Sequence, residues 1–471
     1  MEGSEMTKDV EVLLGNPKKA ILAMAIPTTI ALVAQSVTNL TDAMWVSGLG
    51  TDALAAVGIV FPLFFIMVGI GQGIGIGAAA AISKRIGADN KADADRTAAQ
   101  AVAYMIVASV IVTIVLLIFL EPILRFLGTG ASEETIQQCL RFARPMVMFT
   151  IVFLAVGVMS NVIRSEGAAK RSMYVVIMVA VINLIIEPFF IYDYGLGWGM
   201  TGASLATIVA EAAGIMVIIY WYIIKKDLFL KFRFRGFRFD RLIAKDIFSV
   251  GIPAAFQMIV ISLVSIFMLR ILLMAGGDDG VAIYSSDWRI ISILTIPVMG
   301  IAMGIVPVCA AALGAERYDK IKDAYNYALK ISISLMVVVM IITIIFAPQM
   351  NMAFTYSADT EHLRGGMTDF LRIAALFLPF FAMGNCAESL FQSLGMGVRS
   401  LTSTIFRNFL MIPLCYAAAV LTSGLTYIWW GASFAEIIAS GLVLIWSFYV
   451  LRGFIRRRSG IDRKPSEACS N

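Results

Sequence analysis

The chain has 471 residues, of which 59% are hydrophobic and only 15% are charged, and its mean hydropathy is +0.85. Soluble domains carry about 25% charged residues, so this composition excludes a soluble protein. The formal net charge is +5, and the charged residues gather between long apolar runs instead of within them. We therefore predict an all-α polytopic membrane protein.

Twelve apolar runs are long enough to cross about 30 Å of hydrocarbon as helices. The runs are continuous rather than alternating, which excludes a β-barrel. The first run reaches spanning length, so we expect no cleavable signal peptide. The predicted spans are 20–43, 53–82, 97–120, 138–163, 172–192, 201–224, 246–274, 282–312, 324–347, 367–391, 400–421 and 428–451.

Lys and Arg gather in alternate loops, such as Lys84 and Arg85 after the second run and Arg456 to Arg458 in the tail. The intervening loops carry acids instead, such as Asp278 and Asp279. By the positive-inside rule, both termini are expected in the cytoplasm. The even number of spans agrees with this orientation.

The two halves of the chain repeat at an offset of 226 to 229 residues, found by subtracting matched positions. Each half holds six spans, so both halves have the same orientation, and we predict two six-helix lobes related by a parallel pseudo-twofold axis. The predicted units are an N-terminal lobe (1–226), a basic linker (227–245), a C-terminal lobe (246–453) and a tail (454–471). The matched segments are 26–27 with 252–253, 73–77 with 300–304, 87–88 with 314–315, 165–172 with 393–400, and 202–206 with 431–435.

The linker contains a run of alternating basic and aromatic residues, Lys231 to Arg235. Such a run can bind nucleic acid. A basic segment between two membrane lobes more often lies on the anionic cytoplasmic face of the bilayer, which is the interpretation we favour. We expect membrane lipid, and no nucleic acid, as its partner.

No signature of enzyme chemistry is present. The sequence has no GxxxxGK[ST] phosphate loop, and the glycines from Gly69 to Gly77 lie inside an apolar span, where small residues permit close helix packing. The five cysteines show no CxxC spacing, and the single histidine, His362, lies in a polar loop, where we expect it to be solvated. We predict a protein that is not an enzyme and needs no cofactor.

Two acids interrupt the apolar spans of the first half: Asp42 in span one and Glu187 in span five. A carboxylate in the middle of a membrane helix costs about 2.5–3.5 kcal/mol, and such residues usually bind a proton, a cation or a substrate. We predict that Asp42 and Glu187 form a cation-binding centre. The alternative is a buried pair that only holds helices together.

Neutral oxygen groups accompany these acids. Asn183 lies one turn before Glu187, and a hydroxyl comes from Thr207 in span six, so the set suits Na⁺ or a shared proton and not a transition metal. Either cation would relieve the repulsion between the two acids. Pro27 lacks a backbone donor and can bend span one. We expect three further polar residues, Gln35, Asn39 and Asn161, to line a substrate cavity.

The second half has embedded polar groups of its own. Asp287 and Arg289 are expected to neutralise one another, whereas Glu388 has no basic residue within a turn and is the better functional candidate. We assign Glu388 and Gln257 to the substrate cavity. The 26 methionines and 30 phenylalanines include enough side chains to line a cavity for apolar cations.

Several motifs resemble those of the multidrug and toxic compound extrusion (MATE) family, in particular the DinF-like branch of the MOP superfamily. They are Thr38 to Asp42 followed by Trp45 to Gly50, the turn Arg164 to Gly167, and the segment Gly202 to Thr207. The resemblance covers nearly all twelve spans. It implies cation-coupled export of amphipathic, often cationic compounds through the cell membrane of a prokaryote.

The resemblance also bears on individual residues. Asp42 matches the family's helix-one acid, Asn183 its helix-five asparagine, Thr207 its helix-six threonine and Pro27 its helix-one proline. Glu187 stands where an Asp is usual, which keeps the charge but lengthens its reach. This departure leaves the choice between Na⁺ and H⁺ open.

Three functions compete. The leading hypothesis is a monomeric secondary exporter that couples Na⁺ or H⁺ influx to the efflux of small amphipathic substrates. The second is a flippase for lipids or lipid-linked glycans from the same superfamily. Such flippases tend to have a cationic cavity for phosphates, and Arg270, Arg289 and Arg407 in the second half keep this alternative open. The third is a non-transporting receptor or enzyme, disfavoured by the twofold repeat and by the lack of a catalytic constellation.

Overall fold

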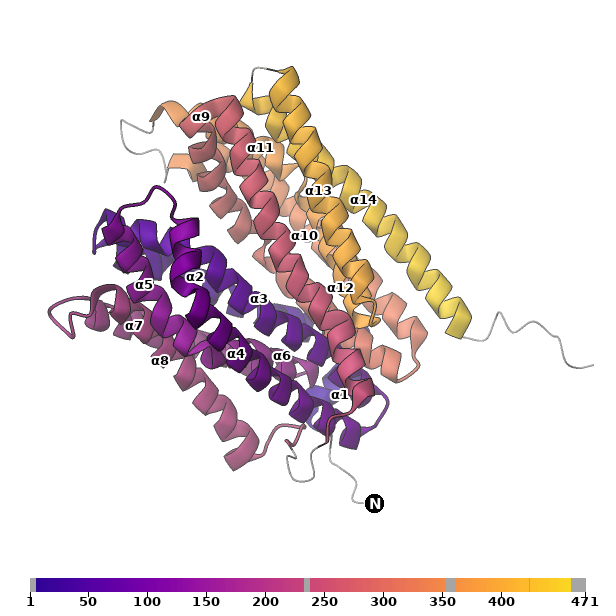
Figure 1. Cartoon of the computed structure of the whole chain (residues 1–471). Helices are drawn as coiled ribbons and strands as arrows, with labels where there is room; N and C mark the ends of the chain where they lie inside the picture. Colours follow the sequence, from indigo (N-terminus) through magenta and orange to yellow (C-terminus); the bar gives the residue numbers. More distant parts are fainter. Residues whose placement is uncertain (1–5, 233–237, 353–360, 423, 459–471) are drawn as a thin grey trace, which may run out of the picture.

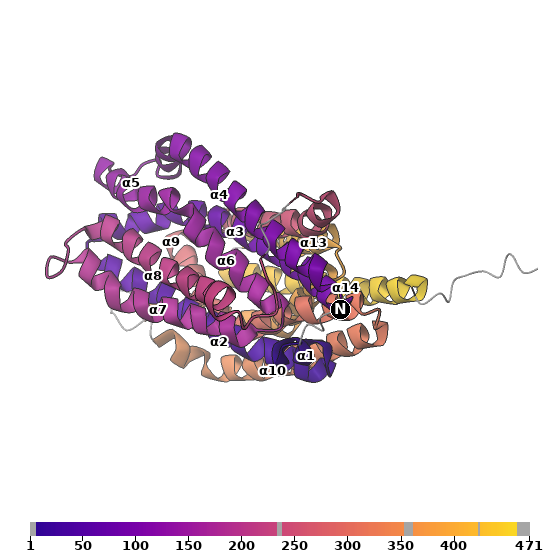
Figure 2. The ribbon, with the colours of Figure 1, turned by 90° about the horizontal axis from the view of Figure 1, so that it is seen from below.

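The computed structural model describes residues 6–232, 238–352, 361–422 and 424–458. Within these ranges every regular element is a helix, and the helices form two groups that lie side by side (Figure 1). The view from below (Figure 2) shows the first-half helices α4, α5 and α8 gathered on one side of the molecule. The α14 helix extends beyond the bundle in both views.

The first half of the chain forms the N-lobe, and most of its apolar runs become single helices longer than the hydrocarbon requires. The fourth predicted span is instead broken, because α5 and α6 meet at an angle of 56° just after Pro145. The elements are α2 (Pro17–Ser47), α3 (Thr51–Gly87), α4 (Lys91–Leu127), α5 (Glu133–Met148), α6 (Thr150–Ser165), α7 (Ala169–Ile191), α8 (Gly199–Ile219) and the π-helical turn η1 (Tyr220–Lys225).

The second half forms the C-lobe and begins with α9 (Arg241–Gly314), which contains two spans. These spans are joined at Gly277, whose φ of 56° lies in the left-handed region that favours glycine. A second bent pair, α11 with α12 at 49°, stands where α5 and α6 stand in the first half. The remaining elements are α10 (Tyr318–Met352), η2 (Glu361–Leu363), α11 (Arg364–Ala375), α12 (Leu378–Ser393), α13 (Gly397–Leu421) and α14 (Leu425–Arg458).

The described residues thus provide nine helices long and apolar enough to span a membrane, and the two bent pairs add two more spans. Because α9 reverses at Gly277 and crosses twice, the total is twelve. The predicted fold class, an all-α membrane protein with six helices in each lobe, is confirmed.

The lobes touch through the repeated glycines. Gly87 of α3 lies so close to Ala311 of α9, and Gly314 of α9 so close to Lys84 of α3, that a Cβ on either glycine would clash with the partner's carbonyl oxygen. The two contacts are related by the internal repeat. The predicted close packing of Gly69 to Gly77 is also observed, because a Cβ on Gly73 or Gly77 would meet the carbonyl oxygen of Gly251 or Ile247 of α9.

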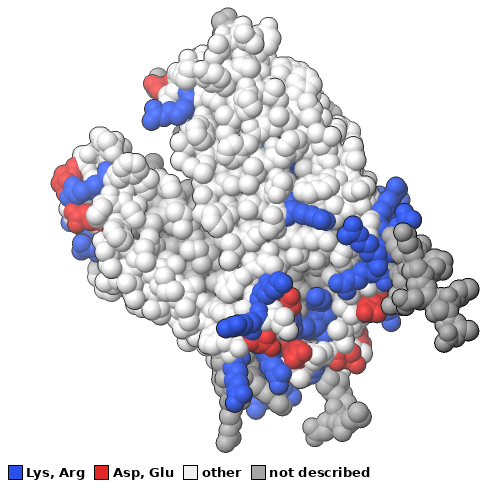
Figure 3. Space-filling model, turned by 45° about the vertical axis from the view of Figure 1, so that its right-hand side comes forward, with Lys and Arg blue, Asp and Glu red and all other residues white. Residues whose placement is uncertain are grey.

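Charged side chains concentrate at the end of the molecule where these glycines meet (Figure 3). We call this the basic end, defined by Lys84, Arg85, Lys322 and the segment Arg456 to Arg458. There an ion pair joins the lobes, with Arg85 Nη2 of α3 lying 2.7 Å from Asp246 Oδ2 of α9. At the opposite end the lobes are separated by a hollow (Figure 3). The lobes are thus closed at the basic end and open at the other.

A short helix, α1 (Lys8–Leu14), also lies at the basic end and was not predicted. Its two buried side chains pack in different places: Val10 joins the N-lobe core, and Leu13 joins a cluster built mostly from C-lobe helices. Lys320 Nζ of α10 donates a hydrogen bond of 3.2 Å to the Leu13 carbonyl oxygen. The α1 helix therefore bridges the two lobes.

The first part of the predicted linker is bound to the N-lobe through backbone N–H groups. Leu230 N–H donates to Glu166 Oε2 at 2.9 Å, and Lys231 N–H donates to Asp95 Oδ1 at 2.8 Å. The Tyr222 hydroxyl donates to the other oxygen of Glu166 at 2.8 Å. Residues 233–237, which hold the rest of the basic and aromatic run, lie outside the described residues.

Candidate functional site

The predicted N-lobe centre is assembled where α2, α7 and α8 meet. The α2 helix supplies Asp42, α7 supplies Asn183 and Glu187, and α8 supplies Thr207. Asn183 and Glu187 are four residues apart and therefore share one face of α7, and each is only 1% exposed. The fold thus brings together four residues that are up to 165 positions apart in the chain, from Asp42 to Thr207.

The carboxyl groups of Asp42 and Glu187 lie within hydrogen-bonding distance of each other. Two ionised carboxylates can only accept hydrogen bonds, so a hydrogen bond between them would need a shared proton. Asn183 Nδ2 donates to Asp42 Oδ1 at 2.8 Å and to Glu187 Oε2 at 3.3 Å when its amide is oriented to satisfy its neighbours. In that orientation Asn183 Oδ1 accepts from the Thr207 hydroxyl at 3.3 Å. The four predicted ligands therefore form one connected network.

A third acid, Glu211, lies beside this network and was missed by the sequence reasoning. It follows Thr207 by one turn on α8 and interacts electrostatically with Asp42. One of its carboxylate oxygens is buried without a hydrogen-bond partner among the described residues. An acid four residues after a candidate ligand, within an apolar span, was the signal that could have found it.

The residues assigned to a substrate cavity in the N-lobe separate into two groups. Gln35 and Asn39 are exposed on α2. Asn161 is buried between α3 and α6, where its Nδ2 donates to Gln72 Oε1 at 3.0 Å and its Oδ1 accepts from Arg164 at 3.0 Å. Asn161 is thus part of the packing between helices and does not lie on an open surface.

Pro27 lies within α2, which continues as one helix from Pro17 to Ser47. The side chain is buried, and the next residue, Thr28, donates its hydroxyl hydrogen to the Met24 carbonyl oxygen at 2.7 Å. Two residues after Pro27, Thr29 contacts Gly300 of the other lobe. A bend at Pro27 would therefore act on the contact between the lobes.

In the C-lobe, Glu388 is not an isolated acid. Arg407 of α13 donates to it at 2.8 Å and also binds Glu436 of α14 at 2.7 Å, so one guanidinium lies between two carboxylates. This partner could not be predicted from spacing along α12, because Arg407 belongs to another helix. Gln257 is likewise buried, and it donates to Thr404 at 2.7 Å and to Ser400 at 3.0 Å.

The expected neutralisation of Asp287 by Arg289 is wrong. Arg289 is exposed on α9, whereas Asp287 is fully buried and neither of its carboxylate oxygens has a partner among the described residues. Residues two apart lie on different faces of a helix, which explains the difference. His362, in contrast, is 58% exposed, in agreement with the expectation of a solvated loop residue.

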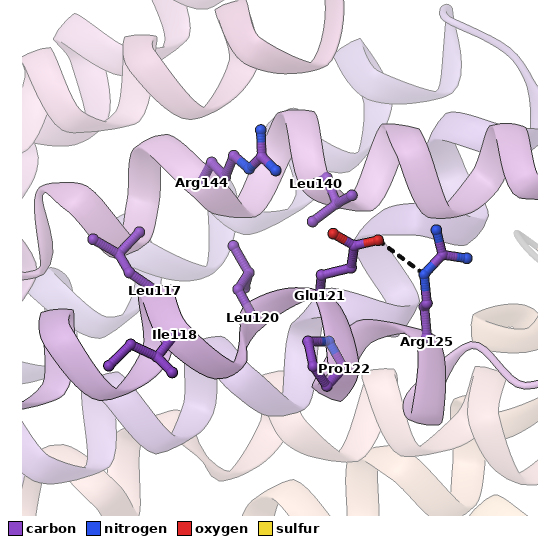
Figure 4. A pocket seen from close by; sticks show the side chains of 8 residues that line it. All are labelled: Leu117, Ile118, Leu120, Glu121, Pro122, Arg125, Leu140 and Arg144. Atoms are coloured by element: carbon purple, nitrogen blue, oxygen red, sulfur yellow. Dashed lines mark hydrogen bonds and ion pairs between the residues drawn. The ribbon is translucent and has the colours of Figure 1, made fainter.

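Two surface pockets lie away from the carboxyl pair. The larger, of about 390 Å³, lies between α4 and α5, where Arg125 binds Glu121 at 3.0 Å (Figure 4). The smaller, of about 270 Å³, lies at the basic end between the lobes and is lined by Arg85 and Asp246. The N-lobe centre is therefore a packed hydrogen-bonded cluster within a helical lobe.

Two six-helix lobes that enclose polar groups within their spans define a membrane transporter, not an enzyme. The MatE family model matches residues 27–189 and 253–417, one stretch in each lobe, and the chain belongs to this family of MATE transporters within the MOP superfamily. The matched stretches begin at Pro27 and Pro253, an offset of 226 residues by subtraction, in agreement with the internal repeat.

Similar proteins include the multidrug export protein MepA of Staphylococcus saprophyticus, which is 24% identical over 443 residues and covers 92% of this chain and 94% of its own length. MepA of Staphylococcus aureus strain MSSA476 is 23% identical over 435 residues, with the same coverage. A solved outward-facing MATE transporter is 32% identical, with a TM-score of 0.92 over 96% of this chain and 100% of that one. A MOP superfamily transporter from Pyrococcus furiosus, reported with a binding pocket of reverse polarity, is also 32% identical, with a TM-score of 0.91 over 98% of this chain and 100% of that one.

Proposed function

We propose that this protein is a secondary active exporter that couples the influx of H⁺ or Na⁺ to the efflux of amphipathic, cationic compounds by alternating access. The observation that carries the proposal is the contact between the carboxyl groups of Asp42 and Glu187, bridged by Asn183. The similarity to named multidrug export proteins supports the substrate class.

The chemistry of the centre explains how an ion would drive movement. With a shared proton, Asp42 and Glu187 can remain in contact across α2 and α7. When the proton leaves, two carboxylates repel each other in a poorly hydrated site, and the helices separate or admit a cation. Loading and unloading therefore change the packing of α2, which also forms part of the contact between the lobes through Thr29.

The geometry accommodates either ion in different ways. A direct hydrogen bond between the two carboxyl groups would hold one shared proton. Among the described residues no three His, Cys, Asp or Glu side chains form a group that could hold a metal ion, so Na⁺ would need Asn183 and Thr207 as neutral ligands. When ionised, Glu211 would supply a further negative charge that favours a cation in the centre.

The arrangement of charge supports an orientation for this conformation. If the basic end faces the cytoplasm, as the positive-inside rule requires, the hollow between the lobes opens to the outside. Both termini then lie in the cytoplasm, and the molecule is in the state that releases substrate. The similarity to a transporter solved in an outward-facing conformation supports this assignment.

The flippase alternative is weakened by Arg407. Its guanidinium is already bound by Glu388 and Glu436, so it is not available for a lipid phosphate. The N-lobe centre is acidic instead of basic and would repel one. We therefore retain export of cationic compounds as the proposed function.

The test is efflux of a fluorescent organic cation from proteoliposomes under separately imposed Na⁺ and H⁺ gradients. We expect Asp42→Asn and Glu187→Gln each to abolish gradient-driven efflux, and the gradient that drives the wild type identifies the ion. The matched control is Asp323→Asn, which makes the same change at an exposed side chain of α10. Wild-type efflux in both carboxyl variants would show that the pair only holds helices together.

A further inference from the structure

The C-lobe contains a buried carboxyl group, Asp287, that is not part of the N-lobe centre. Asp287 lies on the second span of α9, ten residues after the reversal at Gly277, which places it about 15 Å along the helix from the open end of the molecule. Its side chain has an exposed fraction of 0%, and neither carboxylate oxygen has a hydrogen-bond partner in the described part of the chain.

The surroundings of Asp287 are apolar and aromatic. On the same face of α9, Ile283 and Ile291 pack into the C-lobe core, and the Tyr284 ring packs against Phe370 of α11 and Trp429 of α14. The carboxyl group is therefore shielded from bulk water, since the exposed fraction of its side chain is 0%. An ionised carboxylate transferred to such a site without a partner costs so much free energy that the group binds a proton instead.

Other charged groups on the neighbouring elements do not change this conclusion. Asp287 has no electrostatic partner among the described residues; the α9 residues after it include the exposed Arg289, and α10 is uncharged after Lys330. In α12, α13 and α14, Glu388, Arg407 and Glu436 bind one another, so the guanidinium of Arg407 is not available to Asp287. The charged residues of α11 are Arg364, Asp369 and Arg372, of which the last two are exposed.

We propose that Asp287 is a proton-binding site of the C-lobe, separate from the carboxyl pair of the N-lobe, which holds one proton in the conformation described here and releases it when the open-end half of the C-lobe becomes hydrated. The exposed acids Asp278 and Asp279 lie two to three turns before it on the same helix and would attract protons to that end. The step transfers a proton between the Asp287 carboxyl and water and breaks no other bond.

Infrared difference spectroscopy of the full-length protein in lipid, recorded as the pH is changed, tests this inference without any transported substrate. We expect the wild type to show carbonyl-stretch bands of protonated carboxylic acids that are lost at alkaline pH, and Asp287→Asn to lack one of these bands and to release one proton fewer per chain. Asp287→Leu, with a side chain of similar size, should give the same spectrum.

The Asp42→Asn/Glu187→Gln double variant removes the N-lobe carboxyl pair and should retain the Asp287 signal. A failure of the proposed coupling centre would therefore leave this result intact. If the Asp287 band persists at every pH, Asp287 never releases its proton and the proposal is wrong. An unchanged number of released protons in both Asp287 variants would also overturn it. An Asp287→Asn chain that unfolds while Asp287→Leu folds would also overturn it, because a protonated acid is mimicked best by the amide.

Discussion

Arg407 and Glu388 form an ion pair of 2.8 Å between α13 and α12, inside the C-lobe and almost out of contact with solvent. The same guanidinium donates through Nε and Nη2 to Glu436 of α14 at 3.1 and 2.7 Å. Ser440 also donates to Glu436 at 2.7 Å. One side chain thus holds three helices together, and the cluster carries one unit of net negative charge.

Replacement of Arg407 by Met should be strongly destabilising, because it leaves Glu388 and Glu436 buried without a counter-ion. Loss of one partner from such a cluster typically costs about 3–5 kcal/mol of the free energy of unfolding. Thermal unfolding in detergent measures the effect. Arg289→Met, which removes an exposed guanidinium, is the control and should have little effect. The triple variant Arg407→Met/Glu388→Gln/Glu436→Gln should recover much of the loss, and equal melting temperatures for Arg407→Met and Arg289→Met would contradict the argument.

The Thr207→Val substitution tests whether the helix-eight hydroxyl supports the N-lobe centre. It removes the hydrogen bond to Asn183, which is worth about 1 kcal/mol, so we expect roughly fivefold weaker apparent affinity for the coupling ion. The ion concentration that gives half-maximal efflux is the measured quantity. In Thr343→Val the lost hydroxyl bonds only within its own helix, to the Val339 carbonyl oxygen, so this control should behave like the wild type. Unchanged half-maximal concentration in Thr207→Val would remove the threonine from the ligand set.

Gly314→Ala should prevent the lobes from closing at the basic end, because the added Cβ would meet the carbonyl oxygen of Lys84. Spin labels at the exposed positions Arg96 and Lys322, one in each lobe, would report a shift to longer distances by electron–electron double resonance. Cys469 is replaced by Ser for this labelling, since the other four cysteines are buried. Gly441 faces open space, so Gly441→Ala is the control. Identical distance distributions for Gly314→Ala and the wild type would show that this contact does not limit closure.

The buried Glu166 makes stability depend on pH. Its loop lies outside the membrane spans, and burial raises its pKa from 4.5 to about 7 despite the hydrogen bonds from Leu230 and Tyr222. Between these values the folded protein binds more protons than the unfolded chain, so stability is highest below about pH 4.5 and falls by about 3 kcal/mol as the pH rises through 7.

Glu166→Gln should flatten this dependence, which unfolding measured across that pH range would show. The amide oxygen can still accept from Tyr222, but its NH₂ group cannot accept from the Leu230 N–H, so we also expect the linker to be cut faster by protease. Glu134→Gln, at an exposed position, is the matched control. A pH slope in Glu166→Gln as steep as in the wild type would assign the dependence to other groups.

Local patterns predicted much of this molecule. Apolar runs defined all twelve spans, because membrane helices satisfy their own backbone hydrogen bonds and need no distant partner. The repeated glycines and the acids Asp42 and Glu187 were found for a related reason: each is anomalous within its own segment. Glu211 could have been found by the same criterion.

Partners on other helices could not be predicted in this way. The ion pair of Glu388 depends on how α12 and α13 are rotated against each other, and no spacing along α12 carries that information. The α1 helix was missed because its seven residues bury only Val10 and Leu13, too few for a recognisable pattern. The error at Asp287 and Arg289 was avoidable, since residues two apart do not face each other on a helix.

The position of α1 has a practical consequence for experiments in living cells. Because Val10 packs in one lobe and Leu13 against the other, this helix has to rearrange whenever the lobes separate at the basic end. A fluorescent protein or affinity tag fused before α1 would hinder the rearrangement of this helix. A tag fused after α14, which extends beyond the bundle, would not affect the contacts of α1. The choice of fusion terminus can therefore alter the measured export rate.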